Sequence, residues 1–96
     1  MHAAAVRLEL KIPDVQSLKQ KRHRIKRLTA RLSDAFSVSV SEIDHHDAWQ
    51  RTTIGVAVVA SQAGHLERII HSVQRMMLED PDFELLEMGV AYMEEE

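Results

Sequence analysis

The spacing of apolar residues switches between a period of two and a helical period, and this order constrains the fold more than any other feature. Four segments have the pattern of strands: 3–12, 37–44, 52–60 and 83–92. Segments 17–36 and 65–79 repeat apolar residues three and four positions apart, which predicts two amphipathic helices. The predicted order of elements is therefore β-α-β-β-α-β.

Breaker and capping residues mark where these elements end. Pro13 stops the first strand, because proline cannot donate to a strand ladder. Ser17 followed three residues later by Gln20 is a capping box that opens the first helix. Asp80-Pro81-Asp82 ends the second helix. Residues 45–51 show no apolar alternation and are expected to form a hairpin loop.

Alternation also predicts which side chains share a face of the sheet. The third strand is apolar on both faces, which is typical of a central strand. Glu42 and Asp44 lie two apart and are expected on one face, either as an acid/base pair or as charges that protect an edge strand. The last strand is expected to turn four residues toward one side: Leu86, Met88, Val90 and Tyr92.

Two right-handed βαβ crossovers nest into a four-stranded antiparallel sheet of order 4-1-3-2 with both helices on one face. We therefore predict an α+β, ferredoxin-like fold: one domain over residues 1–93 and a frayed acidic tail at 94–96. The 96 residues contain no cysteine for a disulfide, no signal-peptide layout and no membrane span, so we expect a cytoplasmic protein without membrane contact. This fold hosts many functions and implies none of them.

Charge is divided unevenly: residues 1–40 sum to +6 and residues 41–96 to −9. The first helix carries seven lysines and arginines against one aspartate, although like charges four apart oppose a helix. This arrangement favours phosphate binding, with contacts from Lys19, Lys21, Arg22 and Lys26. The alternatives are a solvated basic face, or cations that pair with acidic residues of the same chain or of a neighbouring one.

The predicted loop, taken with Asp44 before it, contains the only tryptophan, two histidines and two aspartates. Its histidines, His45 and His46, are adjacent and therefore point apart, so we expect no metal site. The loop can instead bind a partner through Asp47, Trp49, Gln50 and Arg51, since Trp and Arg are enriched at binding hot spots. In the alternative, Trp49 caps one end of the core.

The outward face of the two central strands lacks aromatic residues, which argues against base stacking in the manner of RNA-recognition motifs. Its small residues include Ala3, Ala5, Gly55 and Ala57, and they favour close packing of another flat surface. We therefore expect a homodimer through this face or an edge strand, the alternative being coverage by the chain's own tail. Nucleotide-loop and nucleophile motifs are absent, so we expect neither enzyme activity nor a cofactor.

Four stretches of the sequence are distinctive: Ile-Pro-Asp-Val-Gln-Ser-Leu-Lys-Gln-Lys-Arg at 12–22, Phe-Ser-Val-Ser-Val-Ser-Glu at 36–42, Asp-Ala-Trp-Gln-Arg at 47–51 and Ile-Gly-Val-Ala at 54–57. Together they resemble the YlxP-like family of small bacterial proteins, a domain of unknown function. The resemblance implies a ferredoxin-like fold and no catalytic residue. It also implies a gene neighbourhood between translation initiation factor 2 and ribosome-binding factor A. Our leading hypothesis is thus a non-enzymatic protein that binds RNA or a ribosomal particle. The alternative is a protein-interaction module that uses the loop and forms homo-oligomers.

Overall fold

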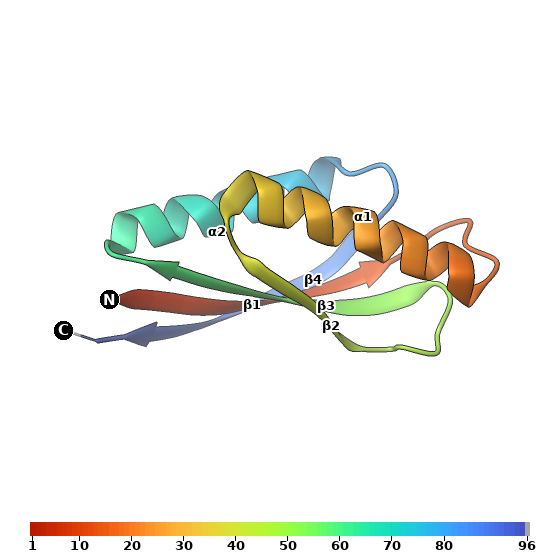
Figure 1. The fold of residues 1–96 in the computed structure, drawn as a ribbon, viewed down its shortest axis with the longest axis horizontal. Coiled ribbons are helices and arrows are strands. Elements are labelled where there is room, and N and C mark those ends of the chain that lie inside the picture. The colour runs from red at the N-terminus through yellow and green to blue at the C-terminus, as the bar shows by residue number, and fades with distance from the viewer. Residues whose placement is uncertain (96) are drawn as a thin grey trace.

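The computed structural model describes residues 1–95 and confirms the predicted order of elements (Figure 1). The six elements are β1 (His2–Lys11), α1 (Leu18–Phe36), β2 (Ser39–Asp44), β3 (Arg51–Ala60), α2 (Ala63–Glu79) and β4 (Glu84–Glu94). Each predicted element is present with ends shifted by at most two residues.

The strands form one sheet of order β2-β3-β1-β4 in which every neighbouring pair is antiparallel. This is the predicted order 4-1-3-2 counted from the other edge. Both helices cover the same face, with α1 toward the end that holds the β2–β3 loop and α2 toward the chain termini (Figure 1). The α+β class and the ferredoxin-like arrangement are confirmed. We call the opposite, uncovered side of the sheet the open face.

The core lies between the sheet and the helices. Alternate residues of β1 and β3 are buried there, including Leu8, Leu10, Ile54 and Val56. On the helix side of the core, α2 contributes four buried residues: Leu66, Ile70, Val73 and Met77. The molecule measures 47 × 21 × 20 Å, so this core is long and thin.

Local hydrogen bonds explain where α1 begins and ends. The Ser17 hydroxyl accepts from the Gln20 backbone N–H at 3.1 Å, as the capping box predicts. At the other end Ser37 adopts a left-handed conformation with φ 53° and donates its backbone N–H to the Ser33 carbonyl. Residue 37 therefore caps the helix, and β2 begins at Ser39 rather than at the predicted position 37.

Two irregular pairings correct the predicted faces. In β4 the register shifts so that Leu10 pairs with Leu85 and Glu9 with Glu87, which leaves Leu86 as an exposed extra residue. In β2 a similar shift pairs Glu42 with Ile54 but Asp44 with Thr53. The acidic pair predicted on one face is wrong, because the residue between them is bulged and their side chains face opposite sides.

The predicted tail is also corrected. Glu94 belongs to β4 and pairs with His2, and the Glu95 backbone N–H donates to the Met1 carbonyl at 2.9 Å. These residues prolong the sheet edge and do not fold over the open face. Glu96 lies outside the described residues.

Candidate nucleic-acid interface

Lys21 does not lie with the other predicted phosphate ligands. Its side chain is only 1% exposed and points under α1, where the ammonium lies 3.1 Å from Glu42 Oε2 and donates to the His45 carbonyl. The Thr52 hydroxyl donates to the same carboxylate oxygen at 2.6 Å. We call Lys21, Glu42 and Thr52 the Lys21 cluster. Because its ammonium faces the protein interior, Lys21 does not belong with the residues predicted to contact RNA.

The Lys21 cluster is not among the sites predicted from the sequence, although the pattern of apolar residues indicates it. The core stripe of α1 runs through Ile25, Leu28 and Leu32, and Lys21 lies one turn earlier on the same stripe. Glu42 likewise follows Val38 and Val40 on the core side of β2. A cation and an anion that both interrupt an apolar stripe are expected to meet, since neither can be buried alone.

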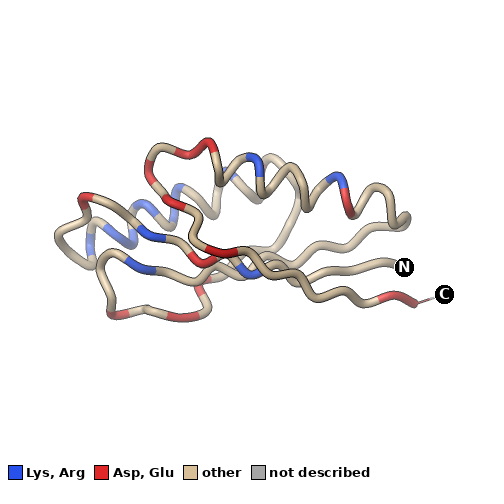
Figure 2. Tube along the Cα trace, turned by 180° about the vertical axis from the view of Figure 1, so that it is seen from behind, with Lys and Arg blue, Asp and Glu red and all other residues tan. Residues whose placement is uncertain are grey.

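Three further cations of α1 are held by the chain itself. The Arg31 guanidinium contacts the fully buried Asp80 carboxylate, and Arg27 lies 3.7 Å from Asp82. Arg24 donates to the Pro13 carbonyl at 2.7 Å. Figure 2 shows the acidic residues of the α2–β4 turn and the basic residues spread along α1. Part of the charge asymmetry is thus neutralised inside one chain, as one of the alternatives predicted.

The remaining cations of α1 form one exposed surface. Lys19, Arg22 and Lys26 are exposed and spaced three or four residues apart, so they share a side of the helix, and the exposed His23 lies next to Arg22. We call these four residues the basic face. Within residues 1–95, Lys19, Arg22 and Lys26 take part in none of the ion pairs. Three of the four predicted phosphate ligands therefore lie together and face solvent.

The loop between β2 and β3, residues 45–50, lies at the same end of the molecule as the basic face. Hydrogen bonds hold both ends of this loop to neighbouring segments of the chain. We call it the tip loop. The Ile12 backbone N–H donates to the Gln50 carbonyl at 2.9 Å, and the Gln50 side-chain amide donates to the Val15 carbonyl at 3.2 Å. On the other side the His45 carbonyl accepts from Lys21. Gln50, predicted to contact a partner, therefore holds the tip loop against the β1–α1 connection.

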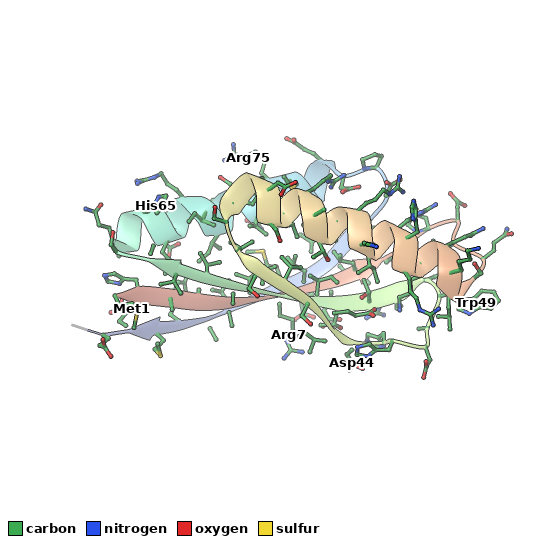
Figure 3. The ribbon with its side chains drawn as sticks, viewed as in Figure 1. Met1, Arg7, Asp44, Trp49, His65 and Arg75 are labelled. Atoms are coloured by element: carbon green, nitrogen blue, oxygen red, sulfur yellow. The ribbon has the colours of Figure 1, made fainter. Side chains whose placement is uncertain are left out.

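Of the other predicted loop residues, Arg51 begins β3 and lies 3.6 Å from Glu9 on the open face. Asp47 is exposed, and Trp49 is 51% exposed at the tip (Figure 3). The alternative in which Trp49 caps one end of the core is not supported, because Trp49 is half exposed and is not among the side chains packed against the core. The tip loop thus offers a partner Trp49 and Asp47, whereas Gln50 and Arg51 have contacts within the chain.

Asp44 precedes a strained position at the start of the tip loop. His45 has a left-handed backbone with φ 64°, and its N–H donates to Asp44 Oδ1 at 2.7 Å. This hydrogen bond, helped by the charge of the His45 imidazole, lowers the pKa of Asp44 below its ordinary value. Across residues 1–95, no three His, Cys, Asp or Glu side chains are grouped so that they could hold a metal ion.

The open face is built from matched rows on β1, β3 and β4. Ala5 lies between Ala57 and Ala91, and Arg7 lies between Gly55 and Gly89. The glycines leave a shallow hollow around Arg7 whose rim includes Ile43. The exposed large apolar side chains on this side include Ile43, Val59 and Met93.

None of the helices within residues 1–95 is both long enough and apolar enough to span a bilayer.

Comparison with known proteins places the chain in a family. Residues 3–90 match the family described as protein of unknown function (DUF503). The chain is 40% identical over 73 residues to "Uncharacterized protein YlxP" of Bacillus subtilis (strain 168), an alignment that covers 76% of this chain and 79% of that protein. The family match at residues 3–90 runs from β1 through both helices into β4, and the chain belongs to the DUF503 family of YlxP-like proteins.

Proposed function

We propose that the protein binds RNA, free or within a ribosomal particle, through the basic face of α1. The observation that carries this proposal is the exposed set Lys19, Arg22 and Lys26, which has no anionic partner among residues 1–95. Of the other cations of α1, Lys21, Arg27 and Arg31 lie against carboxylates and Arg24 donates to a backbone carbonyl, so contacts within the chain do not account for these three. A helix that tolerates such crowding of positive charge suits a polyanionic ligand.

Their spacing suits a phosphate backbone. Side chains at positions 19, 22 and 26 project from one side of α1, and long flexible cations can follow successive phosphates of one strand. Such contacts fix position and supply affinity without reading sequence. The gene neighbourhood implied by the family resemblance makes RNA the polyanion that we favour.

Salt dependence and matched variants test this proposal. Three phosphate contacts with a single strand predict that log affinity falls with log salt at a slope of about −2. We expect the triple variant K19Q/R22Q/K26Q to lose most affinity for labelled RNA in fluorescence anisotropy, with a flatter slope. Arg75→Gln, an exposed cation on α2, is the matched control (Figure 3). Equal loss in the control, or an unchanged triple variant, would refute the proposal.

Sedimentation of tagged protein from growing cells distinguishes free RNA from a particle. Migration with a ribosomal subunit, lost in the triple variant, supports binding to the particle. If the protein stays at the top of the gradient while RNA binding in vitro persists, the ligand is free RNA.

As a second function, we propose self-association through the open face, on the strength of its rows of alanine and glycine. These rows make a surface flat enough for another sheet to pack at about 10 Å, and Ile43, Val59 and Met93 supply exposed apolar area. Arg7 and Arg51 lie on this face with Glu9 and Glu87, so a second copy offers charges of both signs. The occupant that we favour is thus another copy of this chain.

Light scattering at micromolar concentration tests self-association. A dimer has twice the 11.0 kDa mass of the chain. Ala5→Glu places a carboxylate in the middle of the alanine row, so it is expected to return the protein to monomers. Leu78→Ala, at an exposed apolar residue of α2, is the control and leaves the dimer intact. A monomeric unmutated protein contradicts the proposal.

A further inference from the structure

We infer that Trp49 stacks on an unpaired base of the strand that the basic face holds, so that the ligand class is single-stranded RNA. This inference rests on the proposed function and goes beyond it, because phosphate contacts alone do not distinguish single strands from duplexes.

The exposure of Trp49 makes it available to a base. It is the only tryptophan of the chain and is half exposed at the tip of the molecule, and it belongs neither to the buried core nor to the side chains packed against it (Figure 3). An indole ring is the strongest stacking partner among side chains for a flat base, and such stacking tolerates any base identity.

The tip loop is already ordered before any ligand arrives. The carbonyl of His45, on one side of Trp49, accepts from Lys21, and the carbonyl and amide of Gln50, on the other side, bond to the β1–α1 connection. Rigid positioning of an aromatic side chain reduces the entropy lost on binding. The buried Lys21 thus serves as a positioning residue, since it holds the tip loop close to the helix that carries the basic face.

Charge separates the two kinds of contact. Asp44 and Asp47 flank the histidines of the tip loop, and their carboxylates disfavour a phosphate there. The basic face on the first turns of α1, at the same end of the molecule as Trp49, favours phosphates (Figure 3). A strand whose backbone follows α1 would therefore present a base, not a phosphate, to the indole.

The inference favours single strands because bases in a duplex are stacked on one another. Freeing a base from a duplex costs a few kcal/mol, whereas a single strand presents its bases readily. Stacking on an aromatic side chain contributes to affinity only after that cost is met. A protein that uses Trp49 in this way binds a single strand more tightly than a duplex of the same sequence.

The experiment compares a twelve-nucleotide RNA, its duplex and inorganic polyphosphate, which has phosphates but no bases. Since Trp49 is the only tryptophan, intrinsic fluorescence reports on it alone. We expect the single strand to quench this fluorescence, and we expect Trp49→Ala to weaken single-strand binding by about tenfold or more. Polyphosphate binding should be unchanged in Trp49→Ala and lost in K19Q/R22Q/K26Q. Trp49→Tyr, which keeps an aromatic ring, should retain most of the affinity.

The outcomes separate this inference from the proposed function. If Trp49→Ala binds the single strand as well as the unmutated protein does, or if the duplex binds equally well, the inference fails while RNA binding stands. If neither RNA nor polyphosphate binds, the proposed function fails with it. Circular dichroism confirms that each variant is folded.

Discussion

The ammonium of Lys21 and the carboxylate of Glu42 lie 3.1 Å apart beneath α1, at positions where the neighbouring turns and strand residues are apolar. Lys21 comes from the stretch at 12–22 and Glu42 from the stretch at 36–42, so the contact joins two of the stretches that resemble the YlxP-like family. The Thr52 hydroxyl donates to the same carboxylate oxygen at 2.6 Å. This contact fastens the first turns of α1 to β2 and to the start of the tip loop.

Removal of one member of this pair should destabilise the fold more than removal of both. Lys21→Met leaves the Glu42 carboxylate partly buried with Thr52 as its remaining partner, and we expect a loss of about 3 kcal/mol in the free energy of unfolding. The double variant K21M/E42L replaces the charges with apolar volume and should recover part of that loss, because the buried Thr52 hydroxyl then lacks its acceptor. Urea unfolding measures both. Equal destabilisation by the single and double variants would show that the ion pair is not the cause.

The fold could be predicted from the sequence because each helix and strand has a local pattern that indicates it. Alternation in β1, the capping box at Ser17 and the proline at 81 determine the order of elements, and the handedness of the crossovers leaves one simple arrangement. The two bulges could not be predicted. A one-residue slip at Ile43 or Leu86 depends on how partner strands pair, and it moves the following residues to the other face.

The candidate site could be predicted only in part, for a related reason. Counting cations along α1 identifies the helix but not which cations are exposed. Lys21 shares the stripe of Ile25 and Leu28, and Arg31 meets an aspartate that is distant in sequence. The identity of those partners depends on tertiary packing, whereas the exposure of Lys19, Arg22 and Lys26 follows from their place opposite the stripe.

Gly55 is required because the bulged Ile43 lies over it. A Cβ at position 55 would come within 2.8 Å of Ile43 Cγ1 and 2.9 Å of Cδ1, so we expect Gly55→Ala to cost about 1 kcal/mol. Gly89, on the other side of Arg7, is the matched control. A Cβ there meets nothing within 4 Å, so Gly89→Ala should be neutral or stabilising by about 0.5 kcal/mol. Thermal unfolding compares them, and Ile43→Ala should cancel the cost of Gly55→Ala.

Tyr92 should titrate above the ordinary range for tyrosine. A hydrogen bond to the Glu67 carboxylate raises the pKa of Tyr92 because it favours the protonated hydroxyl. This contribution to stability is complete below the pKa of about 10 that tyrosine has in the unfolded chain, and it is lost as pH rises through the raised value. The chain has one tyrosine, so ultraviolet absorbance follows it directly. Glu67→Gln should lower the midpoint, and an unchanged midpoint would rule out Glu67 as the cause.

Substitutions of Arg31 and Lys26 should have different effects, although both residues are cations of α1: the first should change stability and the second RNA affinity. The Asp80 carboxylate is fully buried, accepts the Asp82 backbone N–H at 2.7 Å and contacts the Arg31 guanidinium. Arg31→Gln removes the charge that faces this carboxylate, and we expect a loss of about 2 kcal/mol in unfolding free energy with little change in RNA affinity.

Lys26→Gln should do the opposite, because Lys26 is exposed and takes no part in the ion pairs of residues 1–95. The stability of this variant should stay within about 0.5 kcal/mol of the unmutated protein. Its RNA affinity should fall, and the salt slope should become shallower by about 0.7, the contribution of one phosphate contact with a single strand.

Asp80→Asn keeps the acceptor for Asp82 but removes the charge, so it should resemble Arg31→Gln in stability. If Arg31→Gln weakened RNA binding as much as Lys26→Gln does, the RNA-binding surface would extend beyond the basic face along the whole length of α1.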